Sequence, residues 1–227
     1  TAAAIAVACG LVHRRDPEGV VCILTADQLM SDVGTFRTAL ADAVKVAAAD
    51  EAIVTMGIQP TYPATGFGYI ETGDALETGT QTSFHKANRF VEKPDAYTAA
   101  RYVESGRYFW NAGMFIWRTE TMRKALREHA PELAELCGAV AETGTPEGLE
   151  ALLARVYPSL RAISIDYAVM EHVQNIVMAR GAFGWDDVGS WPSVAGHFSA
   201  DLDGNVVIGS CERSEERRVG KECRSRW

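Results

Sequence analysis

The sequence predicts an α/β protein with a mixed, mainly parallel β-sheet, and three observations point to this class. Residues 20–24 form a fully apolar run of the kind found in strands that are covered on both faces. Between residues 32 and 49 apolar side chains recur at helical spacing, and residues 53–58 form a second apolar run. Strand, helix and strand in this order indicate a βαβ unit, whose two strands run parallel.

Caps, chain breakers and shorter apolar runs predict the other elements. Asp95 and Gly106 stand where a helix over residues 96–105 needs its caps, and Thr1 and Asp166 can cap two further helices. We expect helices over residues 2–11, 96–105, 119–137, 146–156 and 167–173, and strands over residues 69–71, 89–92, 114–117 and 176–179. Residues 183–191 are rich in aromatic, acidic and glycine residues and are expected to form a loop.

Charge and composition exclude several classes of function. The net charge of -8 argues against a nucleic-acid partner, because such a surface needs clustered Lys and Arg. No stretch of the sequence approaches the 18 apolar residues of a membrane span, and the apolar start has the wrong charge order for a secretory signal. The five cysteines are widely spaced and include no C-x-x-C pair, which argues against a disulfide framework or a zinc site. These features predict a protein of the reducing cytoplasm.

The last 18 residues, 210–227, differ in character from the rest of the chain. They carry six Lys or Arg and four Glu without a periodic apolar face. We therefore expect residues 1–209 to form the domain and residues 210–227 to be a foreign or disordered tail.

Two segments near predicted strand ends could bind a ligand. Asp27 follows the first apolar strand, and ligands of open α/β sheets bind outside the carboxyl ends of strands. The alternative is that Asp27 only caps the segment that follows. Gly66 and Gly68 would let backbone N–H groups approach a ligand closely, although Gly-aromatic-Gly turns are also common in hairpins.

Two other short segments carry groups that suit a sugar phosphate. Glu92 can accept hydrogen bonds from hydroxyl groups and Lys93 can meet a phosphate as a point charge. The alternative for this pair is an ordinary solvent-exposed strand end. Asn111 offers both a donor and an acceptor, which suits the hydroxyl pairs of a hexose, or else belongs to a turn among core aromatics.

The strongest single signal is the acidic pair Asp186 and Asp187, which stands between Trp185 and Trp191. Adjacent carboxylates repel each other unless a cation or solvent relieves the repulsion. Mg²⁺ would do so, because it binds one or two protein carboxylates and completes its octahedron with phosphate oxygens and water.

Taken together, the motifs resemble a known family. They are Leu-Thr-Ala-Asp at residues 24–27, Thr-Gly-Phe-Gly-Tyr-Ile-Glu at 65–71, Phe-Val-Glu-Lys-Pro-Asp at 90–95, Trp-Asn-Ala-Gly-Met-Phe at 110–115, Ser-Ile-Asp-Tyr-Ala-Val-Met-Glu at 164–171 and Trp-Asp-Asp-Val-Gly-Ser-Trp at 185–191. In this order, over roughly residues 1–209, they resemble the bacterial mannose-1-phosphate guanylyltransferases (GDP-mannose pyrophosphorylases), which are sugar nucleotidyltransferases.

The resemblance implies a Rossmann-like nucleotide-diphospho-sugar transferase fold that is truncated at both ends. It also implies the reaction of GTP with mannose 1-phosphate to give GDP-mannose and pyrophosphate, with Mg²⁺ as cofactor, and it leaves the oligomeric state open, a homo-oligomer included. Carried over by motif, Asp27, Lys93 and Asp187 would be catalytic, with Asp27 and Asp187 as the metal ligands. Substrate binding would fall to Gly68, Tyr69, Glu92, Asn111 and Asp166.

The sequence departs from the family pattern in two ways. The glycine-rich nucleotide loop and the first strand of the family have no counterpart here, so we expect this chain by itself to be poorly stable and inactive. Thr25 and Gln28 replace the Pro and His that usually flank the metal-binding Asp. These replacements keep a non-catalytic regulatory paralogue that binds a sugar nucleotide open as an alternative. A glucose-1-phosphate uridylyl- or thymidylyltransferase of the same fold, or a metal-dependent glycosyltransferase, is the other alternative.

Overall fold

The computed structural model describes residues 1–201 and 204–207. They divide into two units, residues 1–187 and the residues from 188 onward. The predicted tail, residues 210–227, lies outside the described residues.

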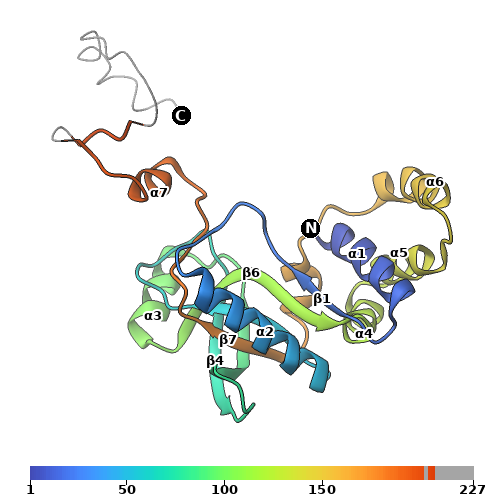
Figure 1. Ribbon diagram of the computed structural model, residues 1–227, viewed down its shortest axis with the longest axis horizontal. Coiled ribbons are helices and arrows are strands. Elements are labelled where there is room, and N and C mark those ends of the chain that lie inside the picture. The colour runs from blue at the N-terminus through green and yellow to red at the C-terminus, as the bar shows by residue number, and fades with distance from the viewer. Residues whose placement is uncertain (202–203, 208–227) are drawn as a thin grey trace, which may run out of the picture. The chain divides into compact units, whose positions relative to one another are not determined.

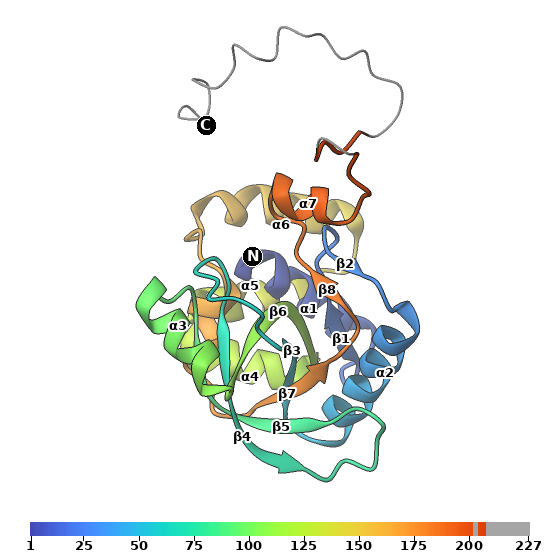
Figure 2. The ribbon, with the colours of Figure 1, turned by 90° about the vertical axis from the view of Figure 1, so that its left-hand side faces the viewer.

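The first unit is built on a six-stranded sheet in the order β1-β6-β3-β7-β5-β4, in which β4 also pairs with β6. The strands are β1 (Val20–Ile23), β3 (Ile53–Ile58), β4 (Tyr69–Leu76), β5 (Phe84–Val91), β6 (Tyr108–Arg118) and β7 (Ile176–Gly181). The added pairing between β4 and β6 closes the five strands from β6 to β4 into a ring. A separate ladder joins β2 (Leu29–Met30) to β8 (Trp185–Asp186), and Figure 2 shows these two strands side by side.

The sheet is mixed, as predicted, but the prediction that it is mainly parallel is wrong. Among the described strands only β3 and β7 pair in parallel, while the other pairings are antiparallel. β1 and β3 point the same way, as a βαβ unit requires, but antiparallel β6 lies between them. The expected burial of the first apolar run also fails, because β1 lies at the edge of the sheet and exposes Cys22. An apolar run does not by itself distinguish an edge strand from a central one.

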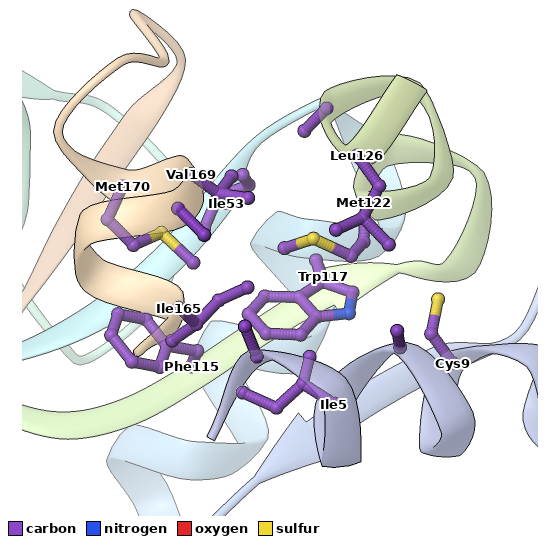
Figure 3. Packing of buried hydrophobic residues seen from close by; sticks show 14 of the residues in the cluster. Ile5, Cys9, Ile53, Phe115, Trp117, Met122, Leu126, Ile165, Val169 and Met170 are labelled. Atoms are coloured by element: carbon purple, nitrogen blue, oxygen red, sulfur yellow. The ribbon is translucent and has the colours of Figure 1, made fainter. Parts of the chain in front are cut away.

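Two helical layers cover the sheet (Figure 1). One contains α1 (Ala2–Arg15), α4 (Thr119–His129), α5 (Pro131–Glu142) and α6 (Pro146–Val156), and the other contains α2 (Val33–Ala49) and α3 (Ala96–Ser105). Each layer packs on its own buried cluster of apolar side chains. In Figure 3 the fully buried ring of Trp117 on β6 lies between Ile5 of α1 and Met122 of α4.

Local capping signals locate the helices well. The Asp95 carboxylate accepts from the Thr98 N–H at 2.8 Å, and Gly106 ends α3 with φ of 67°. Asp32 caps α2 in the same way, accepting from the Thr35 N–H at 2.9 Å. α1 starts where predicted, but the Thr1 hydroxyl accepts from the distant Ile165 N–H and does not cap the helix.

Three predicted elements differ from the observed ones. The helix expected over residues 119–137 is two helices, because Pro131 lacks an N–H and starts α5. The expected helix over residues 167–173 is a short π-helical turn, Asp166–Met170 (η2), after the 3-10 turn Tyr157–Ser159 (η1), and Asp166 does not cap it. Residues 183–191 contain β8 and lead into α7 (Trp191–Gly196) of the second unit, where a loop was expected.

Candidate functional site

Three predicted site residues meet where β4 begins and β5 ends, beside Asn111 within β6. Gly68 precedes β4, and its carbonyl accepts from the Asn111 N–H on β6 at 2.8 Å. A Cβ on Gly68 would lie 2.6 Å from Glu92 Oε2, just beyond β5, so a side chain there would displace the Glu92 carboxylate. The structure therefore brings Gly68, Glu92 and Asn111 together, although 43 residues separate the first from the last along the chain.

Asn111 is buried, and hydrogen bonds fix its side-chain amide. Its Oδ1 accepts from the Gly113 N–H at 3.1 Å and lies 3.0 Å from the Thr55 hydroxyl oxygen, which is fully buried. Its Nδ2 donates to the Asp166 carboxylate at 3.2 Å. The carboxylate that was predicted to cap a helix thus belongs to this site. Thr55 is a supporting residue that the sequence analysis missed, because nothing in an apolar strand marks one Thr as functional.

The two acids of this cluster are held in an unfavourable setting for negative charge. Burial raises the pKa of Glu92 above its usual range, and the charge of Asp166 raises it further, while Lys93 opposes the shift. Burial likewise raises the pKa of Asp166. Lys93 Nζ lies 3.3 Å from Glu92 Oε1 and provides partial compensation. Two half-buried carboxylates of this kind are suited to accept hydrogen bonds from the hydroxyl groups of a ligand.

The backbone at the site adopts conformations that side chains rarely take. Among the described residues two that are not glycine have positive φ, Lys93 at 46° and Val188 at 51°. The first is a predicted site residue and the second directly follows Asp187. A β-branched residue such as Val188 is the most strained in this conformation. Such outliers gather at functional sites, which makes Lys93 a candidate for a functional role.

Tyr69 lies next to this cluster but is entirely buried. Its hydroxyl donates to the Ala64 carbonyl at 2.9 Å, and its ring packs near Tyr102. Its placement favours support of the chain between residues 64 and 68 over direct contact with a ligand.

The second pair of predicted residues, Asp27 and Asp187, is brought together by the β2–β8 ladder. Leu29 pairs with Asp186 and Met30 with Trp185 in antiparallel register. Asp27 lies two residues before β2 and Asp187 follows β8, so both acids leave the same end of the ladder. The sequence signalled each acid separately, but a ladder of two residues per strand has no recognisable sequence signal.

Aromatic rings connect the two parts of the site. Phe67 makes edge contacts with Trp110 at 5.2 Å and with Trp185 at 5.4 Å between ring centroids. Tyr62, which is half exposed, packs on Trp110 at 4.8 Å. Burial raises the pKa of Tyr62, and the charges of Asp187 and Asp186 raise it further, so the acidic pair lies near this ring. Tyr62 belongs to none of the motifs that indicated the site.

The donor set at Asp27 and Asp187 fits a magnesium ion. Within the part of the chain that the structure describes, no cluster of three or more His, Cys, Asp or Glu side chains is placed to hold a metal. A pair of carboxylates does not satisfy an octahedral ion alone, but it matches the usual Mg²⁺ arrangement in which phosphate and water supply the other oxygens.

Over the residues that the structure describes, every helix is too short or too polar to cross a membrane.

Comparison with known proteins identifies the same family as the motifs. The sequence model of the nucleotidyl transferase family matches residues 1–204. The mannose-1-phosphate guanylyltransferase of Sinorhizobium fredii is 38% identical over 212 residues, which are 92% of this chain and 40% of that protein. The xanthan biosynthesis protein XanB of Xanthomonas campestris is 39% identical, over 92% of this chain and 44% of its own length. The chain thus spans less than half the length of these curated relatives.

Solved structures agree with the sequence relatives. A protein of Thermus thermophilus, described as a mannose-1-phosphate geranyltransferase, superimposes with a TM-score of 0.78 at 33% identity, covering 92% of this chain and 58% of that chain. A Helicobacter pylori protein, described as a mannose-6-phosphate isomerase, has a TM-score of 0.65 at 26% identity, covering 82% and 70% of the two chains. The arrangement of the site, the family match and these relatives agree, and the chain belongs to the nucleotidyl transferase family.

Proposed function

We propose that this chain carries the sugar-binding and metal-binding part of an enzyme that joins GTP and mannose 1-phosphate into GDP-mannose and pyrophosphate. The observation that carries the proposal is the meeting of Gly68, Glu92 and Asn111 beside Asp166, with the Asp27 and Asp187 ladder linked to it through aromatic rings. The relatives named mannose-1-phosphate guanylyltransferase support the choice of substrates.

The cluster provides a binding surface for the hexose. Besides their contacts with Lys93 and Asn111, the carboxylates of Glu92 and Asp166 can accept hydrogen bonds from the hydroxyl groups of a bound sugar. A side chain at Gly68 would displace the Glu92 carboxylate, so glycine at this position keeps that acceptor in place. Lys93, which is more than half exposed, is free to turn its ammonium group toward the phosphate of the sugar.

The acidic end of the site, Asp27 and Asp187, would neutralise charge during the transfer by holding a metal ion. In this reaction an oxygen of the sugar phosphate attacks the α-phosphorus of the nucleotide, so positioning and neutralisation of charge contribute more than a protein nucleophile. Asp27 and Asp187 would hold a magnesium ion, which supplies that neutralisation when it is bound. Gly68, Asn111 and Lys93 position the attacking phosphate through the sugar that carries it.

Two alternatives are less well supported. A uridylyl- or thymidylyltransferase has the same fold, but the relatives with 32–39% identity carry mannose-specific guanylyl names or the xanthan biosynthesis name. A regulatory paralogue was suggested by Thr25 and Gln28, yet the acids that would hold the metal are both present.

We further propose a cytoplasmic location, which the free thiols of Cys9, Cys22 and Cys137 support.

Calorimetric titration of the folded chain with mannose 1-phosphate, with and without Mg²⁺, tests the proposal. We expect binding that requires Mg²⁺, that prefers mannose 1-phosphate to glucose 1-phosphate, and that weakens at least about tenfold in Asp187→Asn. Asp74→Asn, an exposed Asp on β4 outside the site, serves as the matched control and should bind like the parent chain. The transfer step is tested by pyrophosphate release, with GTP in preference to UTP, from a longer chain that also carries the glycine-rich nucleotide loop. A folded chain that binds no sugar phosphate under any of these conditions would overturn the proposal.

A further inference from the structure

The side chain of Gln28 connects three segments that are far apart in the sequence. Gln28 lies between Asp27 and β2, and its amide is half-buried. Its Nε2 donates to the Ala112 carbonyl of β6 at 2.8 Å, across 84 residues of chain. Its Oε1 accepts from the indole Nε1 of Trp185 at 2.9 Å, across 157 residues. The Gln28 amide therefore uses its donor toward Ala112 and its acceptor toward Trp185, and so bridges two other segments of the chain.

Each end of this bridge holds a neighbour of a site residue. Ala112 stands between Asn111, which belongs to the sugar cluster, and Gly113, whose N–H fixes the Asn111 oxygen. Trp185 opens β8, and Asp187 follows that strand directly. Gln28 itself adjoins Asp27. The bridge thus ties the two acidic segments to the strand that presents Asn111.

We propose that Gln28 is a positioning residue that sets the distance between the acidic end of the site and the sugar cluster. The inference rests on the proposed function, because it assigns the bridge a role in binding one ligand across both parts. An amide suits this role, since a carboxylate in its place could accept from Trp185 but could not donate to Ala112, and an ammonium could only donate.

The bridge has a measurable consequence for binding. A sugar phosphate touches Asn111 through its hexose and reaches the acidic end through its phosphate, so it binds well only when the two parts are held at a fixed separation. Mg²⁺ and mannose 1-phosphate should then strengthen each other's binding, and this mutual effect is a coupling factor that is the same in both directions. Loss of the bridge should reduce the coupling factor more than the affinity for either ligand alone.

Three variants and one control separate this role from a general structural one. Gln28→Met keeps the length of the side chain and removes both hydrogen bonds, whereas Gln28→Glu keeps only the acceptor for Trp185. Trp185→Phe removes the indole donor and retains an aromatic ring against Phe67. Gln174→Met makes the same chemical change at an exposed position between η2 and β7, away from the bridge.

The coupling factor is measured by titrating each variant with Mg²⁺ and mannose 1-phosphate, singly and together. We expect Gln28→Met to lower it at least about fivefold, and Gln174→Met to leave it unchanged. The double variant Gln28→Met/Trp185→Phe should lower it no further than Gln28→Met, because both changes break one connection. An unchanged coupling factor in folded Gln28→Met, or strictly additive effects in the double variant, would overturn the proposal.

A second measurement does not depend on ligand binding. In ¹⁵N-labelled protein the indole N–H signal of Trp185 should shift and exchange faster with solvent in Gln28→Met, but not in Gln174→Met. An unchanged indole signal would show that Gln28 does not hold Trp185 and would sink the inference. If the parent chain binds neither ligand while the indole signal responds, the proposed function fails and the bridge remains as a connection without a role in coupling.

Discussion

Two buried parts of the first unit differ in what their residues contact. Where α1 crosses α5, small and apolar side chains meet, and a Cβ on Gly10 would lie 2.5 Å from the Cys137 carbonyl oxygen. Around Asn111 of β6, the buried polar groups are its own amide and the hydroxyl of Thr55 on β3, beside half-buried carboxylates. Close helix packing contributes stability through contact, whereas buried acids and left-handed non-glycine residues reduce it. The difference teaches that stability and ligand binding are concentrated in separate places.

The largest effect should follow from adding one methyl group at the helix crossing. Gly10→Ala forces the α5 backbone to move, and we expect a loss of about 1–3 kcal/mol in the free energy of unfolding. Gly138→Ala on α5 is the control, because its new Cβ meets no atom within 4 Å. That variant should gain about 0.5–1 kcal/mol from the higher helix propensity of Ala. Urea unfolding measures both changes in the free energy of unfolding. Equal changes in the two variants would contradict close packing at Gly10.

A smaller effect should follow from the same substitution at Gly113, two residues after Asn111 within β6. Gly113 has φ of 69°, but a Cβ there would meet nothing nearer than 4.0 Å. Gly113→Ala therefore tests backbone conformation without a clash, and we expect it to destabilise the chain by about 1 kcal/mol. Gly113→Asn should cost less in the same unfolding experiment despite its larger side chain, because Asn tolerates the left-handed region. A greater loss for Asn than for Ala would point to packing as the cause.

Sequence signals located helices such as α3 and α6 because those signals are local. Asp95 and Gly106 are caps whose partners lie within a few residues, and the structure places them at the ends of α3 as predicted. Strand direction is different, since the insertion of β6 between β1 and β3 depends on residues more than 50 positions away. The apolar runs at β1 and β3 were therefore recognised as strands, while the pairing of their sheet was not.

The motifs indicated the residues of the candidate site one by one but not their arrangement. The motifs named Glu92, Asn111 and Asp166, and the structure brings them together. Asp166 was first interpreted as a cap because Asp before a helical segment usually is one. Thr55 and Gln28 carry no composition signal, since their roles come from hydrogen bonds to partners that are at least 56 residues away along the chain.

The last predicted effect depends on pH, and here the substitution is expected to stabilise the chain. The pKa of Asp166 is raised in the folded chain by burial, so the folded state holds its proton more tightly than the unfolded state. The protonated carboxyl adds to the free energy of unfolding, and this contribution is complete below the pKa of Asp in the unfolded chain, which is about 4. The contribution is lost as pH rises through the raised pKa of Asp166 in the folded chain. At neutral pH the charged Asp166 therefore costs stability, and it also raises the pKa of Glu92.

Asp166→Asn removes that charge while its side-chain oxygen can still accept from Asn111. We expect the variant to be more stable than the parent chain at pH 7, by on the order of 1 kcal/mol, with the advantage shrinking as pH falls toward 4. Urea unfolding across this range measures the difference, and Asp74→Asn on the exposed part of β4 should show no such trend. A variant less stable at pH 7 would mean that the charged hydrogen bond to Asn111 outweighs the cost of burial. The expected gain, accompanied by weaker binding of mannose 1-phosphate, would show that this acid is retained for the ligand at the expense of the fold.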